Sequence, residues 1–192
     1  SILNLNGFAN AIYSLSSDST TSCVVTNGAI LTIGNGGSYA GGILGAGGLS
    51  VTGGTLVLKS ALGSNYTGPT ILAGEGMLRA DALEALSSNS DFLLMDAGTL
   101  SLNHFDHTIQ SLYSSSKNSQ IRLGSATLTL KGPQTSVYAG SISFGMDQNQ
   151  ICGGLTLDEG ADLTLSGWNT YSGLTQIHRG TLNYGASDCF SS

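Results

Sequence analysis

Apolar and polar residues alternate in short runs along most of this chain, and residues rich in glycine and asparagine separate the runs. Residues 29–33, 54–58, 126–130 and 162–165 are examples. A period of two is typical of a strand that buries one face. The separators, such as Gly34-Asn35-Gly36-Gly37, suit tight turns because glycine adopts positive φ readily. The pattern therefore predicts an all-β fold made of short strands.

Helical periodicity is confined to Ala80-Asp81-Ala82-Leu83-Glu84-Ala85-Leu86. This stretch is short, and the serine- and asparagine-rich residues 87–90 end it. We expect a loop or a single turn that leaves the body of the fold.

The sequence also contains a long internal repeat. Residues 3–15 and 100–112 are identical at seven of thirteen aligned positions. Later landmarks recur in the same order, including Tyr39-Ala40-Gly41 as Tyr138-Ala139-Gly140. We interpret residues 1–192 as one segment of a longer protein with two long internal repeats, about 3–99 and 100–192.

Short strands of this kind can form a sandwich, a barrel or a parallel β-helix. A long repeat favours the β-helix, in which each coil of roughly 20 to 25 residues stacks on the one before. Such a fold has no assumed central pocket, so function is expected on its surface. The predicted inward-facing rows are Leu3, Leu5, Ile12, Leu15, Leu56, Leu58, Leu128, Leu130, Leu163 and Leu165.

Composition narrows the function classes. Only 9% of the 192 residues are charged and the net charge is −6, whereas about 25% of residues are charged in an ordinary soluble domain. The six Lys and Arg residues are scattered, which argues against nucleic acid, since phosphate binding needs clustered cations. No stretch approaches the roughly 20 apolar residues of a membrane-spanning helix, so direct membrane insertion of this segment is not expected.

Three cysteines, Cys23, Cys152 and Cys189, are widely spaced and odd in number. No CxxC or CxxH pairing indicates zinc or redox chemistry. We interpret them as ordinary thiols, and a Cys23–Cys152 bridge stays open because stacked coils can bring distant positions together.

Residues 154–182 closely resemble the autotransporter-associated β-strand repeat, and residues 48–78 follow the same pattern more loosely. Residues 100–112 resemble the stretch that often precedes this repeat, with His104 where glycine is usual. The motif positions in the second copy are Leu163, Leu165, Gly167, Asn169, Tyr171, Gly173, Thr175, Ile177, Gly180 and Leu182. Those in the first copy are Asn65, Tyr66, Gly68, Thr70, Ile71 and Leu78.

The resemblance implies a right-handed parallel β-helix (β-solenoid). It also implies secretion to the surface of a Gram-negative bacterium through a C-terminal translocator barrel of the same precursor. The repeat itself is associated with secretion and folding of a passenger, so the resemblance implies neither catalysis nor a cofactor.

Few residues suggest chemistry. His104 and His107 lie three apart, so on a strand they point to opposite faces and do not converge on a metal. Asp158 and Glu159 occupy a glycine-rich turn that we expect to be solvated, unlike a glycosidase acid pair. Trp168, with Tyr66 and Tyr171, could form a sugar-binding platform, but corner residues that cover the core edge are the preferred interpretation. We expect no catalytic, metal or cofactor site.

Two function classes remain. The first is a non-catalytic stalk, adhesin or host-directed effector that binds a host or neighbouring-cell protein or glycan. The second is a carbohydrate-active β-helix of the polysaccharide lyase or hydrolase type, which needs acidic and basic groups on one lateral groove. For the first class, binding is expected on the non-repeating excursions 80–90, 114–119 and 146–151. The candidate residues there are Asp81, Glu84, Lys117, Asp147 and Gln148.

Overall fold

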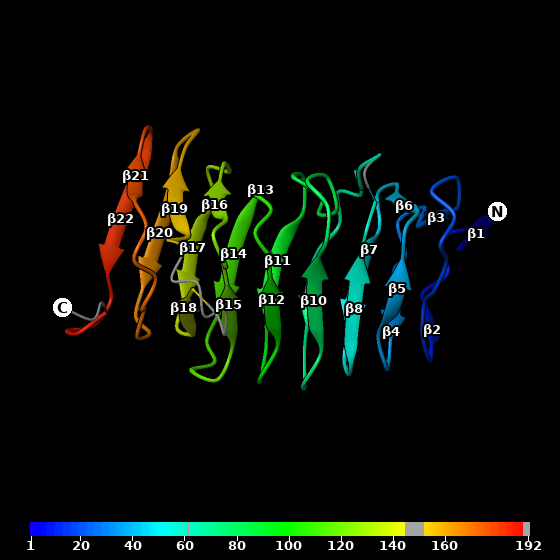
Figure 1. Cartoon of the computed structure of the whole chain (residues 1–192), viewed down its shortest axis with the longest axis horizontal. Helices are drawn as coiled ribbons and strands as arrows, with labels where there is room; N and C mark the ends of the chain where they lie inside the picture. The colour runs from blue at the N-terminus through cyan, green and yellow to red at the C-terminus, as the bar shows by residue number, and fades with distance from the viewer. Residues whose placement is uncertain (61, 145–151, 190–192) are drawn as a thin grey trace.

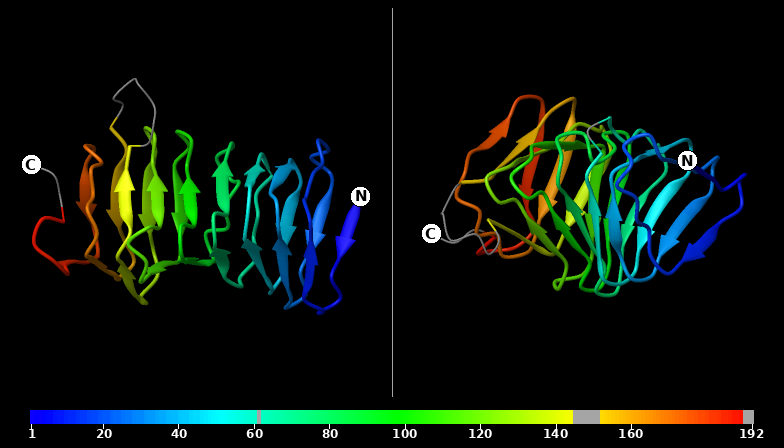
Figure 2. Two further views of the ribbon diagram at one scale, coloured as in Figure 1. Left: turned by 90° about the horizontal axis from the view of Figure 1, so that it is seen from below. Right: turned by 45° about the vertical axis from the view of Figure 1, so that its right-hand side comes forward.

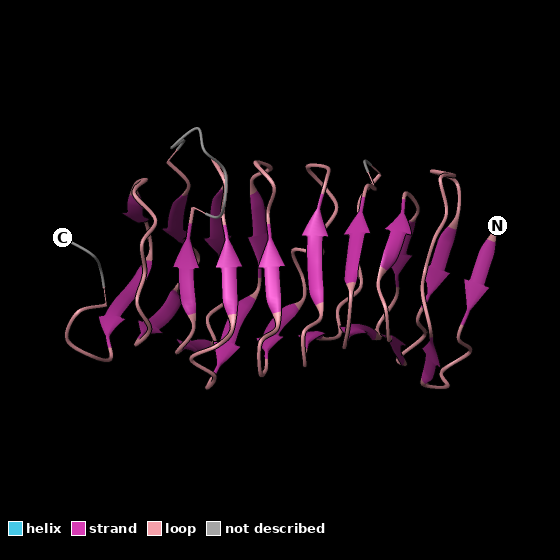
Figure 3. Ribbon diagram, turned by 60° about the horizontal axis from the view of Figure 1, so that its bottom comes forward, coloured by secondary structure: helices cyan, strands magenta, loops and turns pink. Residues whose placement is uncertain are grey.

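The computed structural model describes residues 1–60, 62–144 and 152–189. The described residues form 22 strands and no helix, and every strand pairing is parallel. The strands stack along one long axis from the N-terminus to the C-terminus (Figures 1 and 3). Because each coil pairs with the next one, the molecule is a parallel β-solenoid of about eight coils, as the sequence predicts.

The first face of the solenoid is a nine-stranded sheet that runs its whole length (Figure 2). Its strands, in spatial order, are β2 (Asn10–Ile12), β4 (Ile30–Ile33), β7 (Gly48–Val51), β9 (Thr70–Leu72), β11 (Asp91–Leu94), β14 (Ser111–Ser114), β17 (Thr135–Tyr138), β20 (Ala161–Leu165) and β22 (Gly180–Tyr184).

The second face is a six-stranded sheet, and each of its strands directly follows a strand of the first face in the chain. Its strands are β5 (Gly37–Tyr39), β8 (Thr55–Leu58), β10 (Met77–Ala80), β12 (Thr99–Ser101), β15 (Gln120–Arg122) and β18 (Ser141–Ser143).

The third face is divided into two sheets. The N-terminal one contains β1 (Ile2–Asn4), β3 (Cys23–Val25) and β6 (Gly42–Leu44), and the C-terminal one contains β13 (His107–Ile109), β16 (Thr127–Leu130), β19 (Gly154–Leu157) and β21 (Thr175–Ile177). In the described residues of the two intervening coils, no strand forms on this face. They remain in contact through the Ser64 amide, which donates to the Glu84 carbonyl at 3.1 Å.

The coil length matches the sequence-based expectation. Leu49 pairs with Thr70 and Thr70 pairs with Phe92, which are separations of 21 and 22 residues. Ile142 reaches its partner Asn169 over 27 residues, and this longer coil contains residues 145–151. A regular coil places like positions over one another, which is why the interior consists of rows.

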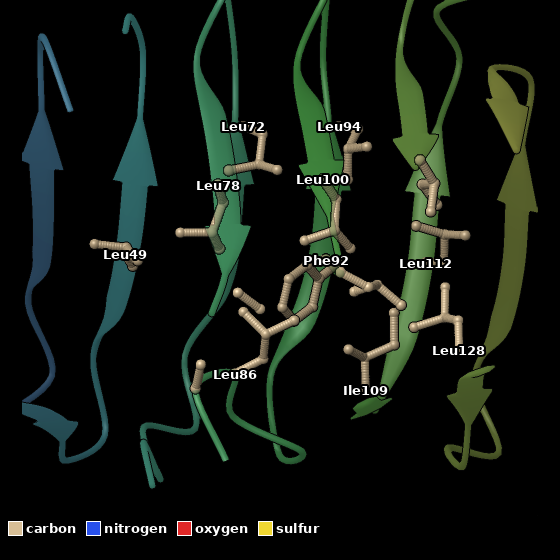
Figure 4. Close-up of a cluster of buried hydrophobic side chains, with 14 of the residues drawn as sticks. Leu49, Leu72, Leu78, Leu86, Phe92, Leu94, Leu100, Ile109, Leu112 and Leu128 are labelled. Carbon is tan, nitrogen blue, oxygen red and sulfur yellow. The ribbon is translucent and has the colours of Figure 1, made fainter. Parts of the chain in front are cut away.

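The core is one cluster of buried, mostly aliphatic side chains inside the three faces, and Figure 4 shows part of it. One row follows paired positions from Leu78 through Leu100 and Ile121 to Ile142, and all four side chains are fully buried. Of the residues predicted to face inward, all except Leu3 and Ile12 are buried, and Ile12 packs against the core while partly exposed. Stacked apolar rows therefore hold the coils together.

Leu3 is the exception, because it is 38% exposed. It pairs with Val24, which is fully buried, so Leu3 continues an inward row. Within the described residues, however, β1 pairs with β3 alone. The prediction that Leu3 is buried is therefore wrong. Leu3 belongs to an inward row, as predicted, but its strand pairs with a neighbour on one side only.

The two copies of the long repeat lie on different faces. Leu3 lies on the third face and its aligned residue Leu100 on the second. Likewise Tyr39 lies on the second face and Tyr138 on the first. The aligned residues are 97 and 99 positions apart, which is not a whole number of coils of about 21 residues. The repeat thus preserves local structure but is turned by one face around the solenoid axis.

Local contacts show what the repeat preserves. The glycine after each Tyr-Ala pair, Gly41 or Gly140, lies against a serine of the preceding coil and the tyrosine hydroxyl. A Cβ at Gly41 would collide with the Ser22 carbonyl oxygen, and one at Gly140 would collide with that of Ser119. Only glycine allows this approach of two backbones.

The described residues contain no helix that is long and apolar enough to cross a membrane.

Candidate functional site

A lateral groove of about 390 Å³ opens on the third face, where the strand-free coils meet the sheet that starts with β13. One wall comes from the loop after β10, and the floor comes from β13 and β16. The turn after β19 closes its far side. The lining residues are Leu83, Glu84, Leu86, Ser88, Asp106, His107, Thr108, Thr129, Lys131, Asp158 and Glu159.

The wall loop, residues 81–90, forms no helix but a tight turn in which the Ala85 amide donates to the Ala82 carbonyl at 3.2 Å. It does not leave the body entirely, since Leu86 is buried in the core. Ser87 Oγ donates to the Tyr66 carbonyl of the preceding coil at 2.6 Å. The tip of the loop, which carries Glu84, stays exposed.

Asp81 lies at the base of this loop but outside the groove lining. Its carboxylate accepts two hydrogen bonds from Arg79, at 2.7 and 2.6 Å, and one from Asn103 Nδ2 at 2.8 Å. The Arg79 guanidinium holds the pKa of Asp81 below its usual value. This candidate binding residue is therefore committed to contacts within the chain.

Two groove carboxylates are fixed by the backbone. Asp106 Oδ1 accepts from the Thr127 amide at 2.6 Å. Asp158 accepts from the Glu159 amide at 2.8 Å and from Arg179 Nε at 3.1 Å. The Glu159 amide and then Arg179 lower the pKa of Asp158, so Asp158 is ionised at neutral pH. Glu84 and Glu159 are exposed, and the groove therefore carries fixed and accessible negative charge together.

His107 occupies the floor, where its side chain is 5% exposed. Its Nε2 atom has no hydrogen-bond partner in the part of the chain that the structure describes. Burial lowers the pKa of His107 to about 4, and Asp106 opposes this shift only partly. The imidazole is therefore neutral at pH 7, with a polar atom unused.

Lys131 is the single cation among the described lining residues. Its Nζ donates to Ser88 Oγ at 3.3 Å, across two coils. Acidic and basic groups thus meet on one groove, with the acidic groups in excess. Across the described residues, no group of three or more His, Cys, Asp or Glu side chains could hold a metal ion.

His104 and His107 do not lie on one strand, although the spacing argument assumed that they do. His104 lies in a turn with φ of 73° and its Nδ1 is within 3.0 Å of Ser125 Oγ, whereas His107 points into the solenoid from β13.

A second groove, of about 480 Å³, contains Lys117, the candidate residue of the 114–119 excursion, together with Trp168. Ser141, Ser166 and Asp188 also line it. Trp168 is 64% exposed, whereas Tyr66 and Tyr171 are buried with their hydroxyls on Thr70 and Thr175. The corner interpretation therefore describes the two tyrosines, and Trp168 stays available for contact. Asp147 and Gln148, in the 146–151 excursion, lie outside the described residues.

The repeat motif itself has a structural role around Asn169, which is fully buried. Asn169 Oδ1 accepts from the Ile142 amide at 2.9 Å, and Nδ2 donates to the carbonyls of Gly167 and Cys189 at 3.0 Å each. In the first copy the same backbone position, Ile43, donates to Ser64 Oγ at 3.3 Å. Ser64 therefore takes the role that the motif alignment gives to Asn65, which is exposed. Aligning the copies on Tyr66 and Tyr171, without a slip, identifies Ser64 from sequence.

Replacing Asn169 by Ala is expected to lower the free energy of unfolding by about 2 kcal/mol. The change leaves the buried Ile142 amide without its partner, the Asn169 side chain, and an unsatisfied buried group costs about 1–3 kcal/mol. Urea unfolding followed by circular dichroism measures the loss. Thr170→Ala is the matched control, and an equal loss in both variants would contradict this role of Asn169.

The remaining motif residues follow their position along the solenoid. Leu163, Leu165, Leu78 and Thr70 are buried, whereas Thr175 and Ile177 are exposed because β21 is the last strand of its sheet. The structure contains no Cys23–Cys152 bridge.

Comparison with known proteins gives one partial relationship. The chain is 36% identical, over 100 residues, to an adhesin autotransporter, BmaC, of Brucella suis biovar 1 (strain 1330). The matched stretch spans 52% of this chain and 3% of that protein. No protein-family profile matches the chain. No solved structure matches it either.

Proposed function

We propose that this chain, whose β-solenoid fold and partial similarity to an adhesin fit an autotransporter passenger with repeats, is a non-catalytic binding segment displayed at the surface of a Gram-negative bacterium. Secretion would use a translocator barrel in the same precursor. The partner is a protein or glycan of a host or neighbouring cell.

The lateral groove is the observation that carries this proposal. Its wall loop is anchored in the core through Leu86 and Ser87, so the exposed tip is held on a rigid support. Rigid supports lower the entropic cost of binding. The repeat motif and the loops differ in the same way. Asn169 and Tyr66 of the motif form hydrogen bonds within the chain, whereas the loops between the coils present the exposed charges.

A carbohydrate-active solenoid is the second candidate, because acidic groups and Lys131 do meet on one groove. Two features speak against catalysis in this groove. A glycosidase acid needs a raised pKa, whereas the pKa of Asp158 is lowered by the Glu159 amide and Arg179. In addition, Lys131, the basic residue that a lyase would need on this groove, donates a hydrogen bond to Ser88 Oγ. The non-catalytic role is therefore the better supported proposal.

Adherence and turnover assays together test the proposal. Beads coated with the purified segment should adhere to cultured epithelial cells, and beads coated with heat-unfolded segment should not. The same preparation should release no product from a panel of polysaccharides and peptides. Turnover that is abolished by Asp158→Asn or His107→Gln would refute the non-catalytic role, and equal adherence of folded and unfolded segment would refute the binding role.

A further inference from the structure

We propose that the Trp168 groove, which also contains Lys117 and Asp188, binds a neutral glycan, with the apolar face of one pyranose ring packed against the indole of Trp168. This inference rests on the proposed surface-binding function and adds to it a second site with a stated ligand chemistry.

The Trp168 groove follows one corner of the solenoid. Its lining residues come after β14, β17, β20 and β22, which are consecutive strands of the first face. Neighbouring coils are about 4.8 Å apart, so the four corners span roughly 14 Å. The volume of about 480 Å³ lies in the range of about 300–1,000 Å³ that is usual for ligand pockets. The shape therefore suits a ligand that extends along the solenoid axis.

Trp168 is not required by the turn in which it lies. When the two repeat copies are aligned without a slip, the residue that matches Trp168 is Gly63. The side-chain hydrogen bond of this corner comes from the next position instead, which is Asn169 in the second copy and Ser64 in the first. The indole is 64% exposed, and tryptophan is enriched among the residues that dominate binding. We therefore infer that this side chain contacts a ligand.

The backbone on both sides of Trp168 is fixed. A Cβ at Gly167 would collide with the Gly140 carbonyl oxygen of the preceding coil, so the two backbones are in close contact there. On the other side, the Asn169 amide donates to the Cys189 carbonyl at 2.8 Å. An aromatic side chain on a fixed backbone loses little conformational freedom on binding.

The polar side chains of the Trp168 groove match the hydroxyl groups of a sugar. Ser141, Ser166 and Ser187 each contribute a hydroxyl, which can donate one hydrogen bond and accept others. Within the described residues, no hydrogen bond occupies the hydroxyls of Ser141 and Ser166. A pyranose ring presents the same kind of group around its edge, so donors and acceptors can be paired on both sides.

The charge of the groove favours a neutral ligand. Lys117 and Asp188 are its one cation and its one carboxylate among the described lining residues, and both are exposed. The chain as a whole carries −6, which disfavours an anionic ligand. Hydrogen bonds from a neutral hydroxyl to a charged side chain are strong, so both residues can orient a sugar that carries no charge.

A peptide fits this groove less well. Beyond Trp168, the apolar side chains of the described lining are those of Ala139 and Ala186. Protein interfaces usually bury a larger apolar core. The neutral glycan is therefore the occupant to test first, and a peptide becomes one outcome of the test.

Tryptophan fluorescence gives a direct readout, because Trp168 is the only tryptophan of the chain. The purified segment is titrated with neutral tetrasaccharides built from glucose, galactose, mannose or N-acetylglucosamine. At least one of them should change the emission of Trp168 in a saturable manner. The absence of a saturable change with every member would overturn the proposal.

Calorimetric titration of variants with the tetrasaccharide that binds best tests the role of the indole. Trp168→Ala should bind about tenfold or more weakly. Trp168→Phe should bind only about threefold more weakly, since the smaller ring still packs against the sugar. The matched control is Tyr113→Ala, which removes an exposed aromatic side chain of β14 outside the groove and should change binding less than about twofold.

All three variants should melt like the wild type, because both side chains are exposed. Equal binding by Trp168→Ala and Tyr113→Ala would overturn the proposal. So would tighter binding of a glucuronate-containing tetrasaccharide, or displacement of the neutral glycan by an equal concentration of an apolar octapeptide.

The adherence assay separates this inference from the function on which it rests. If the folded segment adheres to cells but binds no neutral tetrasaccharide, the glycan inference fails and the surface-binding role stands. If the segment binds a tetrasaccharide through Trp168 but does not adhere to any cell tested, the surface-binding role fails instead.

Discussion

Replacing Leu128 by Ala is expected to lower the free energy of unfolding by about 2–5 kcal/mol. Leu128 is fully buried, and it pairs with His107 on one side and Leu155 on the other. Truncation would therefore leave a cavity between coils that cannot collapse without shifting the strands. Urea unfolding at pH 7, followed by circular dichroism, measures the loss.

Leu3→Ala is the control, because Leu3 belongs to an inward row but lies in the first coil, where it is 38% exposed. It should cost less than about 1 kcal/mol, since little apolar area is uncovered. Equal losses in the two variants would show that the stacked rows do not determine stability as described.

Acidification is expected to destabilise the folded state through His107. Above pH 6.5 the ring is neutral in both the folded and the unfolded chain. Between pH 6.5 and about 4 only the unfolded chain binds the proton, because burial lowers the folded pKa to about 4. Stability is therefore lost as the pH falls through this window, by about 2 to 3 kcal/mol at pH 4.5.

His107→Leu isolates this contribution, because Leu fits the row that Leu128 and Leu155 continue. Carboxylates also titrate in this range, so the measured quantity is the difference between pH 7 and pH 4.5 in each protein. The variant should lose about 2 to 3 kcal/mol less than the wild type, while His178→Gln, at an exposed position, should lose as much as the wild type. The same loss in all three proteins would contradict a buried neutral His107.

The candidate site was only partly predictable. Glu84 was identified from the non-repeating loop, and it does line the groove. Asp81 in the same loop looked equivalent in the sequence, yet Arg79 and Asn103 hold its carboxylate. His107 drew attention in the sequence only as a possible metal ligand together with His104, an interpretation set aside because of their spacing. The groove that His107 lines lies where a coil without a strand on the third face packs beside β13. It therefore depends on how neighbouring coils pack.

The sequence by itself determined the alternation of apolar and polar residues, the glycine turns and the approximate coil length, and together with the long repeat these favour a parallel β-solenoid over a sandwich or a barrel. They are local properties: each depends on the period of a strand or on the backbone freedom of a turn. Only the tertiary structure decided that the two repeat copies lie on different faces, because that depends on how 97 to 99 residues divide into coils. Only the structure brought Glu84, His107 and Asp158 to one groove. These residues are more than 20 positions apart in the sequence. They become neighbours because the coils stack, and the stacking depends on the length and path of every intervening coil.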